Sequence, residues 1–486
     1  MKVKYATEIE NEMDSPQTEP YDSMLIIGDL ICTGKSFLYK TIFNGCTIKG
    51  NIKFSNCSFK DELSFIDTYF EGNISFNNVI FEKSSRFNGC QFGSFSLAYL
   101  NKTEKSFEIK QSCFRGEVNF SSNFYLKANF NQVVFEKIAS FHGVNFLLYV
   151  SFIKCIFMDS ADFMFSEFEG NTLFYKAKFL DEVDFEEAKF GRNMGFEYLL
   201  ISGNSVSGNR RIKKFDFKKS IFNGETSFWK AKFYGNSMFE NTTFFETCNF
   251  LGAMFVGNVG FHGAEFKSFA KFGAGSKIFG NADFSEVVFH EGAYFHNLVF
   301  GKKLKLARAK IENLMIRWDS IRDHLEGNWQ LNEDIIRLEE VFDKSIIPLY
   351  LSLIRNFNNL GFPDDADQCY LELRKKKKKN IEDIKSKIMD DLDCALFGYG
   401  VHWGNPLACG LGIIIFFLLI FFVLDNNFRT NNIAALINAT SNSVSSFISS
   451  PNSDNNLITI LSYIERFLGY IIMSCFLVTL AKKRLR

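Results

Sequence analysis

Residues 130–196 read FNQVVFEKIASFHGVNFLLYVSFIKCIFMDSADFMFSEFEGNTLFYKAKFLDEVDFEEAKFGRNMGF. Phenylalanine recurs in this stretch at steps that alternate between five and six residues, so the true period is eleven. Its positions are Phe130, Phe135, Phe141, Phe146, Phe152, Phe157, Phe163, Phe168, Phe174, Phe179, Phe185, Phe190 and Phe196. A small or β-branched residue lies two positions before most of them, and glycine lies two positions after several, as at Gly143 and Gly170. Such self-similarity indicates a repeat protein.

A five-residue step fits neither the period of a strand nor that of an amphipathic helix. An eleven-residue repeat can form a right-handed coiled coil, but a step of five turns about 140° around a helix and would divide the phenylalanines between two stripes. Recurrent Gly, Phe, Thr and Asn are also poor helix formers. A chain that turns a corner at each repeat can point phenylalanine and the small residue inward, and glycine suits a corner that needs positive φ. The pattern therefore predicts a β-solenoid.

The repeat resembles that of the pentapeptide-repeat proteins, whose unit places a small residue two positions before a central Leu or Phe. The matching segments include Ala231-Lys232-Phe233, Thr242-Thr243-Phe244, Ala253-Met254-Phe255 and Ala264-Glu265-Phe266. The resemblance is to the Phe-rich variant in which units of five and six residues alternate. It implies a mainly β protein, a right-handed quadrilateral β-helix in which four steps of the repeat complete a coil of 22 residues.

The charge balance bears on partners, because the chain has 55 basic and 55 acidic residues and no net charge. Nucleic-acid-binding proteins usually show a basic excess, so no nucleic-acid partner is expected. Some pentapeptide-repeat proteins mimic DNA with an acidic face, and the neutral charge disfavours that function too. Several of the eleven cysteines occupy the small position of the repeat, which indicates buried thiols in a reducing compartment. They are Cys46, Cys57, Cys90, Cys155 and Cys248.

The sequence contains no constellation that indicates catalysis. It has no P-loop, GxSxG or HExxH motif, and four of its six histidines directly follow a repeat phenylalanine, where an exposed corner is expected. We therefore expect no enzymatic activity and no catalytic, cofactor-binding or metal-binding residue.

The predicted organisation follows from where the repeat begins and ends. The expected parts are a polar tail at 1–22, a solenoid of eleven or twelve coils at 23–308, irregular at about 93–129 and with a loop at about 202–211, and a helical cap and connector at 309–400. Within the last part, helices are expected at about 333–345, 347–360 and 364–395, and Leu314, Ile316, Trp318, Ile321 and Leu325 are expected to cap the solenoid. An open solenoid end needs a cap because it exposes unpaired strand edges.

Two apolar segments follow the connector. Residues 407–424 and 457–481 are predicted transmembrane helices, with an extracytoplasmic loop at 425–456 between them and a basic cytoplasmic tail at 482–486. The positive-inside rule then places the solenoid and both termini in the cytoplasm, in a multi-pass protein of the cell inner membrane. The five basic residues Lys375, Lys376, Lys377, Lys378 and Lys379 either bind anionic lipid headgroups or form a solvated helix face.

The tail also resembles a two-span ion-channel pore domain. The matching positions are the Gly398-Tyr399-Gly400 tripeptide, Glu465 and Gly469, although the tripeptide precedes the first span and is predicted to be a turn. The loop between the spans lacks a stretch like the potassium filter TVGYG. Glu465 and Arg466 are expected at the membrane interface or paired between subunits, and Gly469 is expected to let helices approach closely.

These observations leave two functional hypotheses. The first is a membrane-anchored β-solenoid that acts as a cytoplasmic scaffold for an unknown protein partner and needs no cofactor. The alternative is a pore or gating subunit of a homo-oligomer assembled through the transmembrane hairpin.

Overall fold

The computed structural model describes residues 2–93, 105–201, 214–325, 346–379, 381, 383–402, 404–425, 432–448 and 456–484. The chain divides into two compact units, Met1–Leu360 and Gly361–Arg486. The first unit is a β-solenoid with its caps, and all the described secondary-structure elements of the second are helices.

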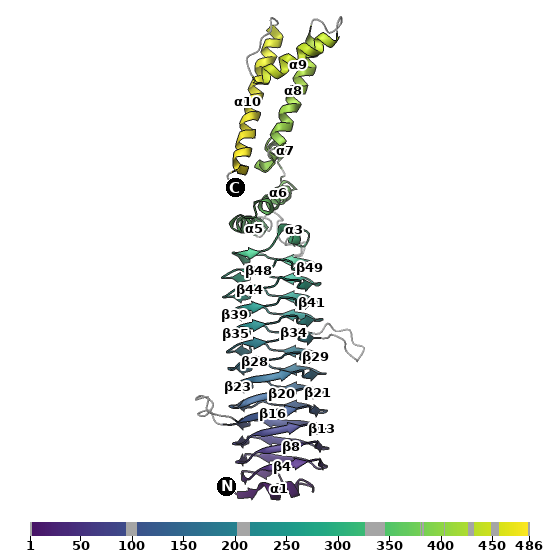
Figure 1. Cartoon of the computed structure of the whole chain (residues 1–486), viewed down its shortest axis with the longest axis vertical. Coiled ribbons are helices and arrows are strands. Elements are labelled where there is room, and N and C mark those ends of the chain that lie inside the picture. Colours follow the sequence, from purple (N-terminus) through teal and green to yellow (C-terminus); the bar gives the residue numbers. More distant parts are fainter. Residues whose placement is uncertain are drawn as a thin grey trace. The chain divides into compact units, whose positions relative to one another are not determined.

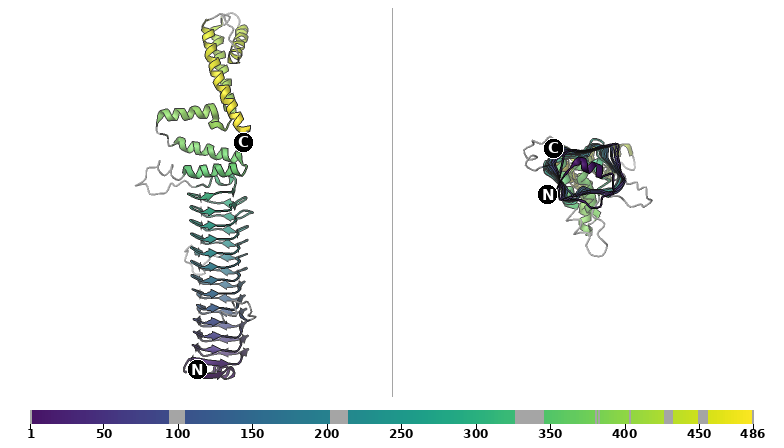
Figure 2. Two further views of the ribbon diagram at one scale, coloured as in Figure 1. Left: turned by 90° about the vertical axis from the view of Figure 1, so that its left-hand side faces the viewer. Right: turned by 90° about the horizontal axis from the view of Figure 1, so that it is seen from below.

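The solenoid consists of four parallel sheets of 14, 13, 13 and 12 strands, which wind through about 13 turns (Figure 1). From β2 onward, strands four positions apart in the chain pair with each other, so the cross-section is four-sided (Figure 2). The predicted fold is thereby confirmed, but the solenoid has about 13 turns and not the eleven or twelve that were expected. The sheets begin and end at β1 (Lys2–Tyr5) and β51 (Lys310–Ile311), β2 (Tyr21–Asp22) and β50 (Leu304–Lys305), β4 (Leu30–Thr33) and β52 (Leu314–Met315), and β5 (Ser36–Phe37) and β49 (Val299–Phe300).

The phenylalanines form columns along the interior. Phe157 stacks on Phe135 with ring centroids 4.7 Å apart and on Phe179 at 4.6 Å, and these rings are nearly parallel. Rings of adjacent columns meet edge to face, as Phe130 and Phe141 do at 5.6 Å. Both geometries suit the quadrupole of an aromatic ring, and the repeat phenylalanines are fully buried. The eleven-residue period therefore specifies the core directly.

The small position of the repeat also points inward, towards the preceding coil. Ser166 donates a hydrogen bond to the carbonyl oxygen of Phe141 at 2.7 Å, and the thiol of Cys155 donates to Phe130 O at 3.2 Å. All eleven cysteines are free, and the five expected in the small position are buried as predicted. Burial raises the pKa of the Cys155 thiol to about 12.

The corners of the solenoid differ in backbone conformation. Two residues after every second inward phenylalanine the backbone adopts positive φ. Glycine occupies this position at Gly143, but Lys154 and Phe165 occupy it in later coils. Gly170 departs from the expectation, because it has no positive φ. A first side-chain carbon at Gly170 would lie 2.3 Å from the carbonyl carbon of Leu148, so glycine is needed there for the close approach of two coils.

Inserted residues leave the register of the solenoid intact. Ser85 pairs with Val118 and Val183 pairs with Phe215, although the usual spacing between partners is 22 residues, as between Leu63 and Ser85. The predicted irregular segment at about 93–129 is partly described, and the solenoid resumes there at β16 (Ser106–Lys110). The predicted loop at 202–211 lies outside the described residues.

The N-terminal segment is not the predicted polar tail. Strand β1 pairs with β3 (Met24–Ile27), and helix α1 (Ala6–Glu12) places Ile9 against the first coil. The hydroxyl of Tyr21 donates to Glu12 Oε2 at 3.0 Å. Acidic residues dominate this segment, but the few apolar ones share one side of a helical turn and cover the open end of the solenoid.

The opposite end of the solenoid is capped by α3 (Trp318–Ile321) and α5 (Ile347–Asn359). The predicted cap residues Leu314, Ile316, Trp318 and Ile321 are buried, and α5 matches the helix expected at 347–360. Asn356 replaces the missing next strand, because its Oδ1 accepts from Leu314 N at 2.9 Å and its Nδ2 donates to Leu314 O at 2.8 Å. The helix expected at 333–345 lies outside the described residues.

The second unit begins with two helices where one was predicted at 364–395. Helix α6 (Pro363–Lys379) and helix α7 (Ile384–Phe397) are separate because Asp383 starts a new helix. Its carboxylate accepts from the backbone N–H of Ser386 at 2.8 Å, which is an N-cap. The remaining helical elements are the 3-10 turn η2 (Gly398–Gly400), α8 (Gly404–Leu424), α9 (Asn432–Ile448) and α10 (Asn456–Arg484).

Candidate functional site

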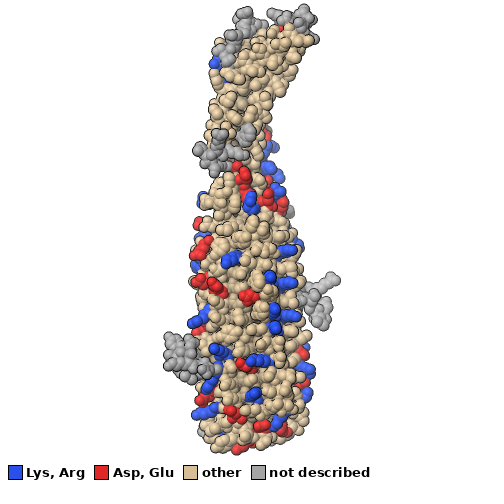
Figure 3. Space-filling view, viewed as in Figure 1, with Lys and Arg blue, Asp and Glu red and all other residues tan. Residues whose placement is uncertain are grey.

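Basic and acidic side chains are interspersed on the solenoid surface (Figure 3). Many form ion pairs between successive coils, as Lys189 and Glu167 do at 2.8 Å and Arg115 and Glu82 at 3.0 Å. Exposed pairs of this kind contribute little stability, about 0–1 kcal/mol each. Their pairing leaves a mixed surface with no broad basic or acidic face in this view.

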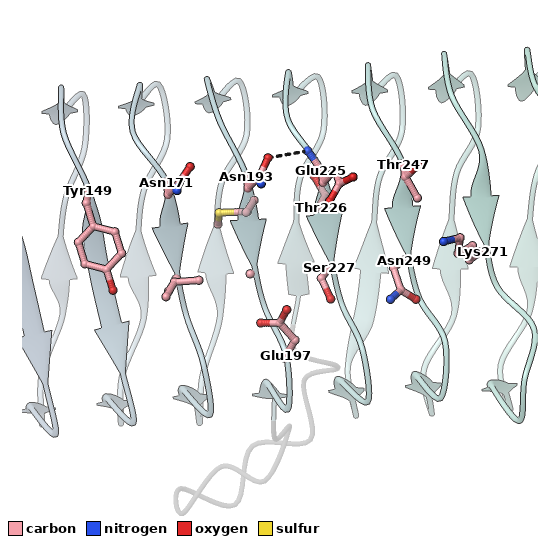
Figure 4. A pocket seen from close by; sticks show the side chains of 13 residues that line it. Tyr149, Asn171, Asn193, Glu197, Glu225, Thr226, Ser227, Thr247, Asn249 and Lys271 are labelled. Carbon is pink, nitrogen blue, oxygen red and sulfur yellow. Dashed lines mark hydrogen bonds between the residues drawn. The ribbon is translucent and has the colours of Figure 1, made fainter.

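A polar groove of about 390 Å³ crosses the sheet that contains β28 (Thr172–Leu173), β32 (Met194–Gly195) and β36 (Thr226–Ser227). Figure 4 shows amide, hydroxyl and carboxylate side chains from successive coils along it. Gly195 lines the groove close to Glu197, because a first side-chain carbon at Gly195 would lie 2.7 Å from Glu197 Oε2. A second polar groove, of about 440 Å³, surrounds Gly260 on another sheet. Both grooves offer hydrogen-bonding groups to an extended partner.

One solenoid corner carries aromatic side chains in three successive coils. Tyr198 lies between Tyr175 and Trp229, with ring centroids 5.9 Å and 5.1 Å away. The ammonium group of Lys230 sits 4.4 Å above the Trp229 ring, and that of Lys176 lies 5.1 Å from the Tyr175 ring. We call these five residues the aromatic corner. It adjoins the first groove along the chain, because Trp229 follows the groove residue Ser227 by two positions.

Three carboxylates on another sheet approach one another closely enough to hold a cation. One oxygen from each of Asp184, Glu186 and Asp216 lies within 4.8 Å of the others. The ammonium group of Lys214 forms an ion pair with the buried Asp216, and Asp184 accepts from the backbone N–H of Glu186 at 2.8 Å. Burial raises the pKa of Asp184. Lys214 therefore supplies the counter-charge within the protein.

In the helical unit, Arg374 joins α6 to α7. Its Nη2 donates to Asp390 Oδ1 at 2.7 Å and to Asp393 Oδ2 at 2.9 Å, and its guanidinium lies 4.4 Å from the Tyr399 ring. The Tyr399 hydroxyl donates to Asp390 Oδ2 at 2.7 Å. Burial is the main cause that raises the pKa of Tyr399, and the hydrogen bond to Asp390 adds to it. The Gly398-Tyr399-Gly400 tripeptide is thus the predicted turn, with Tyr399 locked to α7.

The lysines at 375–379 lie on the last turns of α6 and point in different directions around it. Lys378 forms an ion pair with Asp391 of α7, and Lys375 Nζ lies 3.8 Å from Glu372. Lys375, Lys377 and Lys379 are exposed. Part of the run thus stabilises the α6–α7 pair, and the rest remains available to an anionic surface.

Two helices are long and apolar enough to cross a membrane. They are Gly404–Leu424, with a mean hydropathy of 3.1, and Leu457–Ala481, with 1.6. Large apolar side chains such as Phe416, Leu419 and Val423 are exposed on α8, and the face in Figure 3 carries few charges there. A helix in water would bury such side chains, whereas a lipid-facing helix exposes them.

The predicted extracytoplasmic loop contains helix α9, which packs against both α8 and α10. Its buried face consists of small side chains, namely Ala435, Ala439, Ser443 and Ser446. The prediction of a loop was therefore wrong over residues 432–448. The helix is stabilised by the two neighbours that cover its small residues, and a local sequence pattern does not report that contact.

Contacts along α9 show that it runs back beside the two candidate spans. Ser443 Oγ lies 2.9 Å from Ile414 O, a carbonyl in the middle of α8. Further on, Phe447 lies against two glycines, because a first side-chain carbon at Gly410 would lie 3.4 Å from Phe447 Cζ and one at Gly469 2.8 Å from Phe447 O. Helix α9 is therefore re-entrant with respect to the pair of candidate spans.

Two of the predicted membrane residues, Glu465 and Gly469, face α9. Glu465 is fully buried and its Oε1 lies 2.5 Å from Ser443 Oγ, while its Oε2 has no hydrogen-bond partner among the described residues. Gly469 allows the predicted close approach, but the approaching helix is α9 of the same chain. Arg466 points elsewhere, and its Nε donates to the hydroxyl of Tyr470 at 3.0 Å. Glu465 and Gly469 are thus buried within the chain, whereas Arg466 is partly exposed.

Comparison with known proteins finds one family. Residues 43–91, 152–198 and 217–265 match the profile of the family described as "Pentapeptide repeats", in nine copies. No curated protein and no solved structure matches the chain.

Proposed function

The solenoid of this chain is a pentapeptide-repeat β-helix, and we propose that the protein is a membrane-anchored scaffold whose solenoid binds a protein partner. The apolar helices α8 and α10 are the anchor. In this proposal the solenoid and both termini lie in the cytoplasm of a cell with an inner membrane, because basic residues flank the spans on that side.

The aromatic corner and the adjoining groove are the observation that carries the scaffold proposal. Tyrosine and tryptophan are enriched at protein interfaces and often contribute most of the binding energy. Trp229 is exposed, and the polar groove beside it can bind the backbone of an extended segment. The solenoid holds these groups rigidly, so little conformational entropy would be lost on binding.

Site-specific crosslinking in native membranes tests the scaffold. A photo-crosslinking residue at position 227 of the full chain should capture a partner, and Trp229→Ala should abolish that capture. Tyr234→Ala is the matched control, because Tyr234 is an equally exposed aromatic residue that follows a different strand, β37 (Lys232–Phe233). Equal capture in the two variants would contradict a role for the aromatic corner.

A second function, a pore or gating subunit, is favoured by the re-entrant α9. The side of α9 between its buried small face and its exposed apolar face carries Asn438, Ser441, Asn442 and Ser445. Polar side chains at membrane depth face protein or water, not lipid. Several copies could therefore turn these side chains towards a shared aqueous axis. The C-terminal end of α9, with its partial negative charge, would favour a cation there.

Conductance in planar bilayers tests the pore. The full chain should conduct, and Asn442→Leu should reduce the current because it removes a polar group from the axis. Val444→Leu is the control, since Val444 is exposed on the apolar side of the same helix. Reconstituted protein that stays monomeric, or that conducts no current, would contradict the pore proposal and leave only the scaffold proposal.

A further inference from the structure

Helix α7 carries a ridge of apolar side chains that the described residues of its own unit leave largely exposed. Ile384, Ile388, Met389 and Leu392 are 73%, 54%, 66% and 46% exposed. Their spacing places them within about 140° of the helix surface, a sector that also contains Lys385, whose long side chain can extend past the apolar ones. An uncovered ridge of four large apolar side chains on a short helix is unusual in a water-soluble surface.

The sides of α7 that flank the ridge are held in place by charges. Asp390 and Asp393 bind Arg374 of α6, and Asp391 pairs with Lys378. The turn after α7 adds the hydrogen bond from Tyr399 to Asp390. These contacts fix the rotation of α7 about its axis, so the ridge cannot turn inward to escape the solvent.

The end of α7 is tied to the start of the first candidate span. Asn405 Nδ2 donates to Cys394 O at 3.0 Å, and the thiol of Cys409 donates to Ala395 O at 3.3 Å. Only the turn η2 and the residues up to 403 separate the two helices. Figures 1 and 2 show α7 lying across the direction of α8 and α10, which is the direction a helix in the membrane plane would take.

We propose that α7 is an interfacial helix whose ridge lies in the boundary between the headgroups and acyl chains of the bilayer. This rests on the proposed membrane anchor. An amphipathic helix in this position buries its apolar face in the boundary and keeps its charged face in the headgroup layer. Lys385 and Lys387 of α7 and the exposed lysines at the end of α6 are well placed to bind anionic headgroups. Helix α8 also exposes apolar side chains, such as Leu407 and Leu411, so one lipid environment accounts for both helices.

Fluorescence quenching in vesicles tests the proposal on the full chain. The partly exposed Cys113, Cys394 and Cys409 are replaced with Ala, and the buried cysteines remain. An environment-sensitive dye is then attached at Ile388→Cys or, as the matched control on another side of α7, at Lys387→Cys. The vesicles contain phosphatidylcholine and phosphatidylglycerol, and the quenchers are iodide in water and spin-labelled lipid in the bilayer.

We expect the dye at position 388 to be quenched by the lipid quencher and protected from iodide, and the dye at 387 to behave in the opposite way. Adding Ile384→Asn should increase iodide quenching at 388, whereas Ser386→Asn should not. Iodide quenching at 388 equal to that at 387 would overturn the proposal. Protection of 388 from both quenchers would overturn it too, because protein would then cover the ridge.

A dye at Phe416→Cys on the exposed side of α8 separates this proposal from the membrane anchor. If spin-labelled lipid quenches the dye at 416 but not the dye at 388, the membrane anchor is supported and the interfacial position of α7 is contradicted. If spin-labelled lipid fails to quench the dye at 416, the membrane anchor itself is contradicted.

Discussion

The solenoid and the helical unit treat their large hydrophobic side chains in opposite ways. The repeat phenylalanines are buried by the coils before and after them, whereas α7, α8 and α10 expose isoleucine, leucine and phenylalanine side chains along much of their length. The solenoid thus buries its large hydrophobic side chains within itself, by stacking successive coils. The helical unit leaves that surface for an environment outside the chain, and a bilayer is the simplest one.

The largest expected effect is in the solenoid core. Phe157→Ala should lower the free energy of unfolding by about 3–5 kcal/mol, because the cavity lies between two stacked rings and cannot collapse. Phe165→Ala, at an exposed corner, should change it little. Denaturant unfolding of the full chain in detergent measures both. Equal losses would contradict the division between inward and outward positions.

The next effect concerns the end of the solenoid. Asn356→Leu should cost about 2–4 kcal/mol locally, because it leaves both the N–H and the carbonyl of Leu314 without a partner. Hydrogen exchange should then speed up in the last coil before it does so in the middle. Asn358→Leu, at an exposed position of the same helix, is the control. Unchanged exchange in the last coil would show that Asn356 does not act as a strand substitute.

A smaller effect is expected where α9 meets α10. Gly469→Ala would place a carbon 2.8 Å from Phe447 O, and the resulting displacement should cost about 1–3 kcal/mol. Gly412→Ala in α8 meets no atom within 4 Å and should be tolerated. The rate at which an aqueous thiol reagent labels Ser443→Cys reports whether α9 has moved away from α8 and α10. Faster labelling in the Gly412 variant than in the Gly469 variant would contradict the packing.

The smallest effect is a gain at a corner. Lys154 has positive φ, a conformation that costs most side chains about 1–2 kcal/mol and that asparagine tolerates better. Lys154→Asn should therefore stabilise the solenoid by about 0.5–1 kcal/mol, a fraction of that cost. Lys178→Asn, on a regular strand, should give no such gain. A loss of thermal stability in the Lys154 variant would mean that its side chain makes contacts that outweigh the backbone strain.

Prediction from sequence succeeded where the residues that form a regular sequence pattern are the same residues that the fold buries. The phenylalanine period predicted the four-sided solenoid, the small residue beside each phenylalanine predicted the buried cysteines, and Trp318 and Ile321 predicted the cap. It failed for the N-terminal segment and for α9. Their helices bury only small or scattered apolar residues, such as Ile9 and Ala439, which make no periodic signal of their own.

The sequence by itself determined the solenoid, because every coil makes the same nearest-neighbour contacts and a repeated pattern therefore encodes a repeated structure. Its two long apolar runs likewise determined the helices that could cross a membrane. Only the tertiary structure decided that α9 runs back between them and that Glu465 faces Ser443. Small and polar side chains such as these gain their burial from distant helices, and that gain depends on which helices meet them, not on their neighbours in the chain.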